Sequence, residues 1–455
     1  MRAISPLAAG LLAVGLPLLA QAPPAAAKPA TEPPPEAFGP LATAVIVRSY
    51  GEAELWSLRA VVVLSLGSDW HPDGVPIVLA TLRDRDERLV PYGIEVLRSM
   101  DDASLRQVAT RELIDELVDK QLKRKNALFT DRVLAVLARM LPQAKLTDRK
   151  SAETWWRANR DLYVVEPWSE PPKVQGAQRG ATVGTSVLTR AFDLRDAGLD
   201  VVIVVDSTGS MQIAIDTARD AIDDVVALLS GIAPKLRLGL VDYKDLEDVK
   251  EGGRLLAPLT KNQKEVRDKL AKLQAEGGGD FPERVDKGIE IALSKGMGWN
   301  KDANRLLLVI GDAPVHPEHE TALLDLVKRA YEHPFENGKG AVTGKKAELR
   351  PFVTSTIGIG PGPTEQFARI ATAGGGASVA LELQAPALPP AKPPAGGRGA
   401  PPPPPPPPDA AGRTNASVQQ IVEHVLALSF GPSHRAHLQR FVRTFFEYRA
   451  AGMFR

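Results

Sequence analysis

The sequence predicts an α/β fold, in which a doubly wound and mostly parallel sheet is preceded by an all-α helical-repeat domain. Three observations support this prediction. Apolar residues recur at helical spacing through residues 41–163. Short β-branched runs then alternate with helical segments through residues 199–383, a pattern typical of a parallel sheet with helices on both faces. Of the 39 prolines, 22 lie in two tracts, at residues 1–40 and 385–412, which stand apart from the folded parts.

Composition excludes several classes of protein. The chain has 455 residues, enough for two or three domains. Its 56 Lys and Arg nearly balance its 55 Asp and Glu, which argues against nucleic-acid binding because that requires a clustered basic surface. The chain has no Cys, which excludes disulfides, thiolate metal sites and a Cys nucleophile.

The first 40 residues predict export. Arg2 precedes an apolar run over residues 7–20, and small residues follow, which is the order found in secretory signal peptides. We expect residues 1–27 to be a cleavable signal peptide and residues 28–40 a disordered tether. The apolar run is shorter than the roughly 20 residues of a membrane span, so no stable membrane insertion is expected. The mature protein would be periplasmic, cell-surface or extracellular.

Residues 41–163 predict a domain of short amphipathic helices. Their apparent period is on the order of 30 residues, so the region resembles HEAT-type helical repeats. Trp155 and Trp156 are expected to close the end of the stack. Two interpretations remain open: a concave surface that binds a partner, or a plain helical domain that packs only on its neighbour. Residues 164–198 would form a connector with a short edge strand, predicted from the alternation of Val183, Thr185, Val187 and Thr189.

Residues 199–383 predict a Rossmann-like sheet. The first run, Leu199–Val205, is continuous and rich in β-branched residues, as expected for a strand buried on both faces. The further predicted strands are 236–241, 254–259, 305–310, 352–359 and 378–383. The predicted helices that alternate with the strands are 211–229, 262–275, 284–295, 318–331 and 364–372. Ligands of such sheets bind beyond the carboxyl ends of the strands.

The second proline tract interrupts this domain. Residues 385–412 include eight consecutive prolines and predict a disordered insertion, which would be a neutral linker, a ligand for a proline-binding module or a spacer. An amphipathic segment at 413–430 then supplies the last helix of the α/β domain. A C-terminal helix at 433–450 carries an apolar stripe that is expected to pack on the body.

Three loops at the carboxyl edge of the sheet carry the candidate site residues. Asp206, Thr208 and Ser210 follow the first strand, Asp280 lies in a glycine-rich loop, and Asp312 follows the fourth strand. Carboxylates and hydroxyls without sulfur suit a hard divalent cation such as Mg²⁺. Few direct carboxylates would leave that cation with an open position, which an Asp or Glu of a protein partner could fill.

These motifs resemble the von Willebrand factor type A (VWA) domain and its metal-ion-dependent adhesion site (MIDAS). Asp206–Met211 is the most specific stretch, and Val241–Asp245, Gly277–Glu283 and Gly311–Pro314 follow in the expected order. The resemblance implies a bound Mg²⁺, or in its place Mn²⁺ or Ca²⁺. The hydroxyls of Thr208 and Ser210 would coordinate this cation directly. The carboxylates of Asp206 and Asp312 would coordinate it directly or through water.

The glycine loop departs from the family pattern. The family offers a Thr where this chain has Asp280 followed by Phe281. If Asp280 replaces the Thr, the site gains a negative charge, which would tighten cation binding and make the cation a poorer acceptor for an acidic ligand. Asp280 and Glu283 also form a capping-box pattern with Pro282 in the first turn, so the ligand and cap interpretations of Asp280 both stay open, and Glu283 is expected to be a cap partner.

The expected function is that of an exported, non-enzymatic binding protein of the adhesion type. One alternative is a metal-dependent hydrolase using Asp206, Asp312 and His316. It is disfavoured because Thr208 occupies the position of the second Asp of dehalogenase-like phosphatases, and His316 and His319 lack metalloprotease spacing. A second alternative is a scaffold whose site no longer binds metal. In a third, the hydroxyls of the first loop only cap the next helix, which leaves Asp312 unexplained.

Overall fold

The computed structural model describes residues 40–67, 70–169, 183–245, 251–278, 281–334, 349–360, 362–383 and 409–454. The predicted signal peptide, the tether before residue 40, Asp280 and the proline tract up to residue 408 lie outside these ranges. Predictions about them therefore stay predictions.

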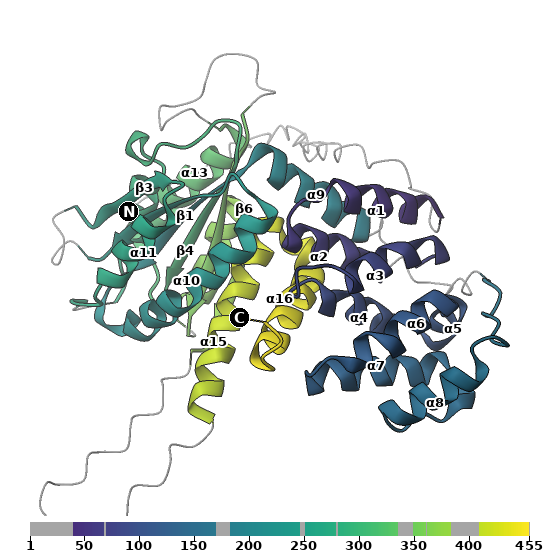
Figure 1. The fold of residues 1–455 in the computed structure, drawn as a ribbon. Helices are drawn as coiled ribbons and strands as arrows, with labels where there is room; N and C mark the ends of the chain where they lie inside the picture. The colour runs from purple at the N-terminus through teal and green to yellow at the C-terminus, as the bar shows by residue number, and fades with distance from the viewer. Residues whose placement is uncertain are drawn as a thin grey trace, which may run out of the picture. The chain divides into compact units, whose positions relative to one another are not determined.

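The first part of the described chain is helical, as predicted (Figure 1). Its helices are α1 (Pro40–Glu52), α2 (Trp56–Ser65), α3 (Val75–Leu82), α4 (Val90–Ser99), α5 (Asp102–Gln107), α6 (Arg111–Asp119), α7 (Ala127–Met140) and α8 (Arg149–Asn159), with 3₁₀ turns η1 (Pro72–Gly74), η2 (Gln121–Lys123) and η3 (Pro142–Ala144). Trp156 is buried, and its indole donates to the Asp115 carboxylate at 2.8 Å, which fixes α8 on α6. The HEAT-like character of these helices stays a prediction.

The segment after α8 returns along the helical region without regular structure. Arg106 donates to Glu166 at 2.8 Å, and Gln107 donates to Ser169 at 2.9 Å. The Trp168 ring meets the His71 ring edge-on at 5.4 Å between centroids. This segment therefore brings the chain back towards η1 before the α/β part begins.

The predicted edge strand within residues 183–189 is wrong, because this segment belongs to helix α9 (Val183–Ala197). Val187, Leu188, Ala191 and Leu194 are buried, and their spacing is helical. The alternation of Val and Thr favours a strand only weakly, and packing of this face against α2 overrides that preference.

The sheet has six strands in the order β3-β2-β1-β4-β5-β6 (Figure 1). These strands are β1 (Leu199–Asp206), β2 (Arg237–Tyr243), β3 (Gly253–Thr260), β4 (Asn304–Gly311), β5 (Phe352–Ile359) and β6 (Gly375–Leu381). All neighbouring pairs are parallel except β2 with β3, which is antiparallel. The predicted doubly wound, mostly parallel sheet is confirmed, although β6 begins three residues before the predicted strand.

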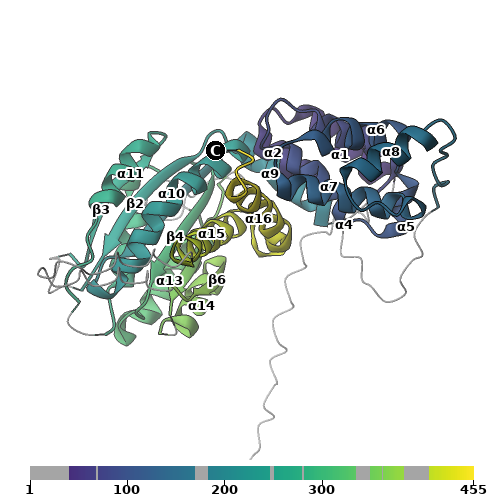
Figure 2. The ribbon, with the colours of Figure 1, turned by 60° about the horizontal axis from the view of Figure 1, so that its bottom comes forward.

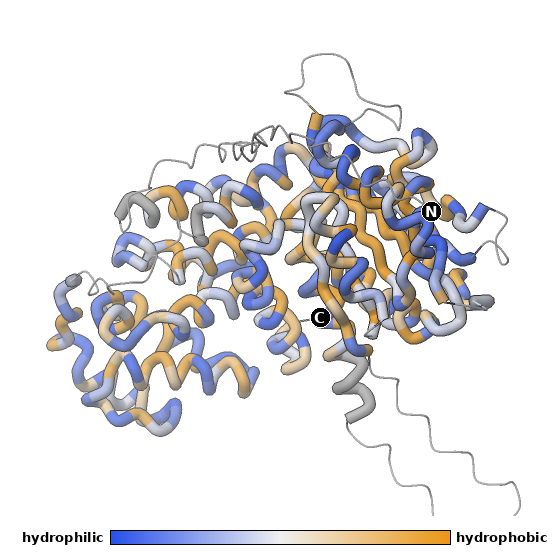
Figure 3. Tube along the Cα trace, turned by 180° about the vertical axis from the view of Figure 1, so that it is seen from behind, coloured by the Kyte–Doolittle hydropathy of each residue, from blue (hydrophilic) through white to orange (hydrophobic). Residues whose placement is uncertain are grey.

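Helices cover both faces of the sheet (Figure 2). One apolar core joins Val201 and Val205 of β1 to α10 (Gln212–Ile232), α11 (Gln263–Lys272) and α15 (Asp409–Phe430). A second core joins Val202 and Val204 to α12 (Val285–Ala292), α13 (Pro317–Glu332) and α14 (Thr364–Ala373). Alternate residues of β1 thus point into different cores, which explains its unbroken apolar sequence. The apolar colour of the central strands in Figure 3 reflects this burial.

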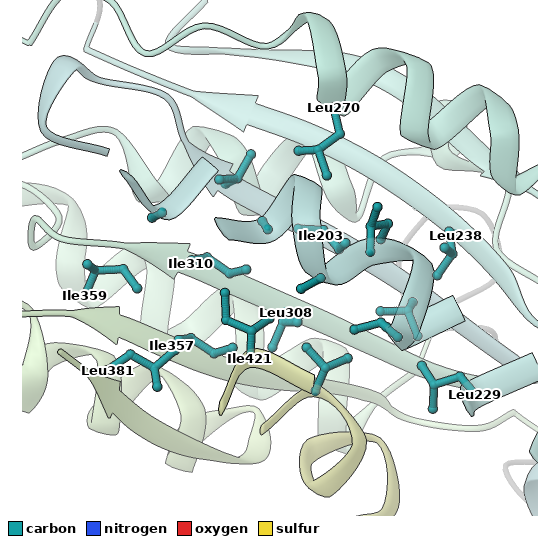
Figure 4. A pocket seen from close by; sticks show the side chains of 18 residues that line it. Ile203, Leu229, Leu238, Leu270, Leu308, Ile310, Ile357, Ile359, Leu381 and Ile421 are labelled. Carbon is teal, nitrogen blue, oxygen red and sulfur yellow. The ribbon is translucent and has the colours of Figure 1, made fainter. Parts of the chain in front are cut away.

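A small enclosed cavity of about 50 Å³ lies between the sheet and helices α10 and α15 (Figure 4). Only Val, Ile, Leu and Ala side chains line it, among them Ile203 and Ile310 of the sheet and Ile421 of α15. A cavity without polar partners is expected to be dry.

The C-terminal helix α16 (Arg435–Ala450) packs on the body, as predicted. Tyr92 of α4 donates its hydroxyl to the Phe441 carbonyl at 3.0 Å, and the His437 ring lies 3.1 Å from the Val61 carbonyl of α2. On its other side, Arg449 donates to Asp224 of α10 at 2.8 Å. Helix α16 therefore connects the helical region to the α/β part.

Among the described helices, none combines the length and the apolar character that a membrane span requires.

Candidate metal-binding site

The sheet topology brings two of the predicted carboxylates to one place. Asp206 is the last residue of β1, and Asp312 follows the last residue of β4. These two strands are adjacent and parallel, with Val205 paired to Ile310, so their carboxyl ends meet at the same edge. Asp206 is fully buried, whereas Asp312 is half-buried.

The Asp206 carboxylate is satisfied on one side only. Its Oδ1 accepts hydrogen bonds from the Thr208 amide at 2.9 Å and the Thr208 hydroxyl at 2.7 Å. Its Oδ2 is buried and has no hydrogen-bond partner among the described residues. Leaving such an acceptor unpaired costs about 1–3 kcal/mol.

The electrostatics of Asp206 reflect this position. Burial raises the pKa of Asp206 to about 7, the hydrogen bonds from Thr208 oppose the rise, and the charge of Asp312 adds to it. A cation beside Oδ2 would supply the missing partner and hold Asp206 ionised. The donor set at this edge therefore fits a hard divalent ion.

The two hydroxyls lie on the turn that follows β1. Thr208 is buried and directs its proton to Asp206, which leaves its oxygen lone pairs available to a cation. Ser210 is exposed in the 3₁₀ turn η4 (Gly209–Met211). Neither η4 nor α10 has a side-chain cap, so the structure does not support the alternative in which these hydroxyls only cap the helix.

Backbone hydrogen bonds hold the glycine loop against this turn. The Gly209 amide donates to the Gly277 carbonyl at 3.0 Å, and the Glu276 amide donates to the Ser207 carbonyl at 3.1 Å. Gly278 has a φ of +84°, and a Cβ there would lie 2.9 Å from the Thr208 Cβ. Glycine is thus required at 278 by both conformation and space.

The predicted role of Glu283 as a cap partner is wrong. Helix α12 begins at Val285, so Glu283 and Pro282 both precede it. The Glu283 amide instead donates to the Pro314 carbonyl at 2.9 Å, which joins the glycine loop to the Asp312 loop. A parallel β-bridge between Glu283 and Val315 adds to this connection before the chain enters α12.

Asp242, which was not among the predicted site residues, supports the turn that carries Thr208. Asp242 is buried at the end of β2, accepts from the Ser207 hydroxyl at 3.0 Å and pairs with Arg254 of β3. This pairing fixes the turn that carries Thr208. The acidic residue directly after the predicted strand 236–241 was the available signal.

The Tyr243 side chain lies beside Gly311, which also borders Asp206. It is fully buried, and a Cβ on Gly311 would lie 2.2 Å from its hydroxyl oxygen and 3.4 Å from Asp206 Oδ2. The close approach of β4 to the site therefore requires glycine at 311.

His316, the histidine of the hydrolase alternative, directly precedes helix α13 on the loop that carries Asp312. His316 Nε2 is 3.6 Å from Asp245 Oδ1, and the rings of His316 and His319 are 6.1 Å apart. Within the described ranges, no group of three or more His, Cys, Asp or Glu side chains is arranged to hold a metal. The candidate site would therefore rest on hydroxyls and two carboxylates, with no histidine cluster among the described residues.

Comparison with known proteins supports the family resemblance. The family model of the von Willebrand factor A domain matches residues 200–333, which contain Asp206, Thr208, Ser210 and Asp312. The α/β part of this chain is therefore similar to a VWA domain over these residues.

Two further similarities cover parts of the chain. A Dictyostelium discoideum protein named alpha-protein kinase vwkA is 28% identical over 132 residues, which are 28% of this chain and 20% of that protein. The chain thus covers 20% of the length of that relative. The kinase activity in the name refers to the relative alone. The solved structure of the conserved hypothetical protein BatB from Bacteroides thetaiotaomicron is 15% identical, covers 41% of this chain and 91% of that chain, and has a TM-score of 0.29.

Proposed function

We propose that this protein is an exported, non-enzymatic binding protein whose VWA domain holds a divalent cation and uses it to recognise a protein partner. Asp206, Thr208, Ser210 and Asp312 would hold the cation, with Mg²⁺ the expected ion and Mn²⁺ or Ca²⁺ as alternatives. The buried Asp206 Oδ2, which has no partner among the described residues, is the observation that supports this proposal most directly.

The chemistry of the site favours an acidic partner. A bound cation supplies an open coordination position that accepts a carboxylate oxygen. Two carboxylates and two neutral hydroxyls leave this position attractive to an Asp or Glu of another protein. The Asp242–Arg254 pair holds the turn that presents the hydroxyls. In the same proposal, Asp280 of the glycine loop would add a third carboxylate to the cation site.

Calorimetric titration tests the cation. Full-length protein is titrated with Mg²⁺, Mn²⁺ and Ca²⁺, and we expect heat that is lost in Asp206→Ala. Asp302→Ala is the matched control, because Asp302 is exposed near the start of β4, at the other end of the strand from the site. A folded protein that gives no heat with any of the three ions, or an Asp206→Ala variant that titrates like the wild type, would contradict the metal site.

Capture of partners with and without EDTA tests the recognition step. A cation-dependent partner is released by the chelator. A partner that stays bound in EDTA would instead favour a scaffold with a degenerate metal site.

Export is part of the proposal. The order of charge, apolar run and small residues before Lys28 supports it. Sequencing the amino terminus of protein recovered from a bacterial periplasm should give Lys28 as the first residue. An intact Met1 would contradict cleavage.

A further inference from the structure

An exposed aromatic side chain lies at the rim of the candidate site. Phe281 is 62% exposed, and among the large apolar residues of the described ranges only Leu162 and Val164 are more exposed. On one side of Phe281 in the sequence Gly278 borders Thr208, and on the other side the Glu283 amide donates to the Pro314 carbonyl. Exposed aromatic side chains on the rim of a polar site are typical of binding surfaces.

The structure places the Phe281 ring beside the Asp312 loop. A Cβ on Gly362 would lie 3.1 Å from Phe281 Cζ and 2.8 Å from the Asp312 carbonyl oxygen. The ring and the Asp312 backbone therefore border the same glycine. An extended chain advances about 3.5 Å per residue, so one or two residues of a bound segment would span the gap between the Phe281 ring and the Asp312 backbone, which border Gly362 from two sides.

We propose that Phe281 determines the specificity of this site. The inference rests on the proposed cation function and extends it. The partner segment carries an Asp or Glu that reaches the cation and, within two residues of it, an aromatic or large aliphatic side chain that packs on Phe281. The cation attracts the carboxylate, and the exposed ring supplies apolar area that binding would bury.

A displayed library of random heptapeptides is the probe. Full-length protein is presented with the library in Mg²⁺, and bound peptides are released with EDTA. We expect the released sequences to pair an acidic residue with an aromatic or large aliphatic residue one or two positions away. The same selection on Phe281→Ser should retain the acidic residue and lose the apolar preference.

Affinity measurements on one selected peptide complete the test. Phe281→Ser should weaken binding about tenfold, which is the range of aromatic contacts at interfaces, while Phe281→Leu should stay within about threefold of wild type. Leu162→Ser, at a still more exposed position in the helical region, should leave binding unchanged. All three variants should titrate Mg²⁺ like the wild type, because the substituted side chains are exposed and are not cation ligands.

The outcomes separate this inference from the proposed function. EDTA-released peptides that carry an acidic residue without an apolar neighbour, or unchanged affinity in Phe281→Ser, overturn the role of Phe281 and leave the cation site standing. A chain that titrates Mg²⁺ but yields no EDTA-released peptide contradicts carboxylate recognition, and both proposals then fail.

Discussion

Individual glycines decide how closely the site can be packed. Gly311→Ala would place a Cβ 2.2 Å from the Tyr243 hydroxyl, and relieving this clash must shift β4 or the Tyr243 ring. We expect a loss of about 1–3 kcal/mol in the free energy of unfolding, together with weaker cation binding. Urea unfolding measures the first effect and calorimetry the second.

Gly51→Ala is the matched control for that substitution. A Cβ at Gly51 meets nothing within 4 Å, and the residue lies in helix α1. This variant should be as stable as the wild type or slightly more so, because alanine favours the helix. Equal stability of the two variants would contradict the tight packing at Gly311.

Two buried histidines should make stability depend on pH. Burial lowers the pKa of His437 to about 4 and the pKa of His424 to about 4, whereas an unfolded histidine titrates near 6.5. The unfolded chain therefore binds more protons between these values, so stability is full above about pH 6.5 and falls as the pH drops towards 4. Each histidine contributes at most about 3 kcal/mol to this loss.

Unfolding in urea at pH 7.5 and pH 5 measures that effect. His437→Gln keeps a donor near the Val61 carbonyl but cannot be protonated, so its stability should change less between the two pH values. A variant with the same pH dependence as the wild type would show that His437 does not carry the effect.

Among the elements, α16 has the clearest structural role. Phe441 is fully buried and lies against the rings of Trp56 at 6.1 Å and Tyr92 at 5.5 Å. Phe441→Ala should cost about 3–5 kcal/mol in the free energy of unfolding, because it leaves a cavity between α16, α2 and α4. Arg443→Ala on the exposed side of the same helix should have little effect. Thermal unfolding of the two variants distinguishes buried packing from a general weakness of α16.

Helix α9 shows where local sequence misleads. Alternation of Val and Thr over residues 183–189 is a strand pattern, yet the segment folds as a helix because its buried side chains pack on α2. The contact lies far away in the sequence, so no local pattern indicates it. The strands of the central sheet were predictable for the opposite reason, since their unbroken apolar runs reflect burial on both faces.

For the whole molecule, the contact between α2 and α10 joins the helical region to the α/β part. A Cβ on Gly231 would lie 1.8 Å from the Ser57 Oγ, which is buried without a hydrogen-bond partner among the described residues. Helix propensity alone predicts that Gly231→Ala stabilises by about 1 kcal/mol. We expect the opposite sign, a loss of about 1–3 kcal/mol, because the two helices must separate.

A double-mutant cycle tests that contact. Ser57→Ala removes the clashing oxygen, so the pair Ser57→Ala with Gly231→Ala should recover at least about 0.5 kcal/mol relative to the sum of the single variants. Urea unfolding of the four proteins gives the coupling energy. Additive effects would mean that α2 and α10 do not meet at these residues.

The sequence by itself determined the class of fold, the place of most strands and helices, and the loops that carry Asp206, Thr208, Ser210 and Asp312. These features depend on short-range periodicity and on motif spacing, which the sequence displays directly. Only the tertiary structure decided that α9 is a helix, that Asp242 supports the turn, that Glu283 joins two loops and that Phe281 stands exposed beside the Asp312 loop. Those outcomes depend on contacts between distant segments, and the packing of the whole chain determines which contacts form.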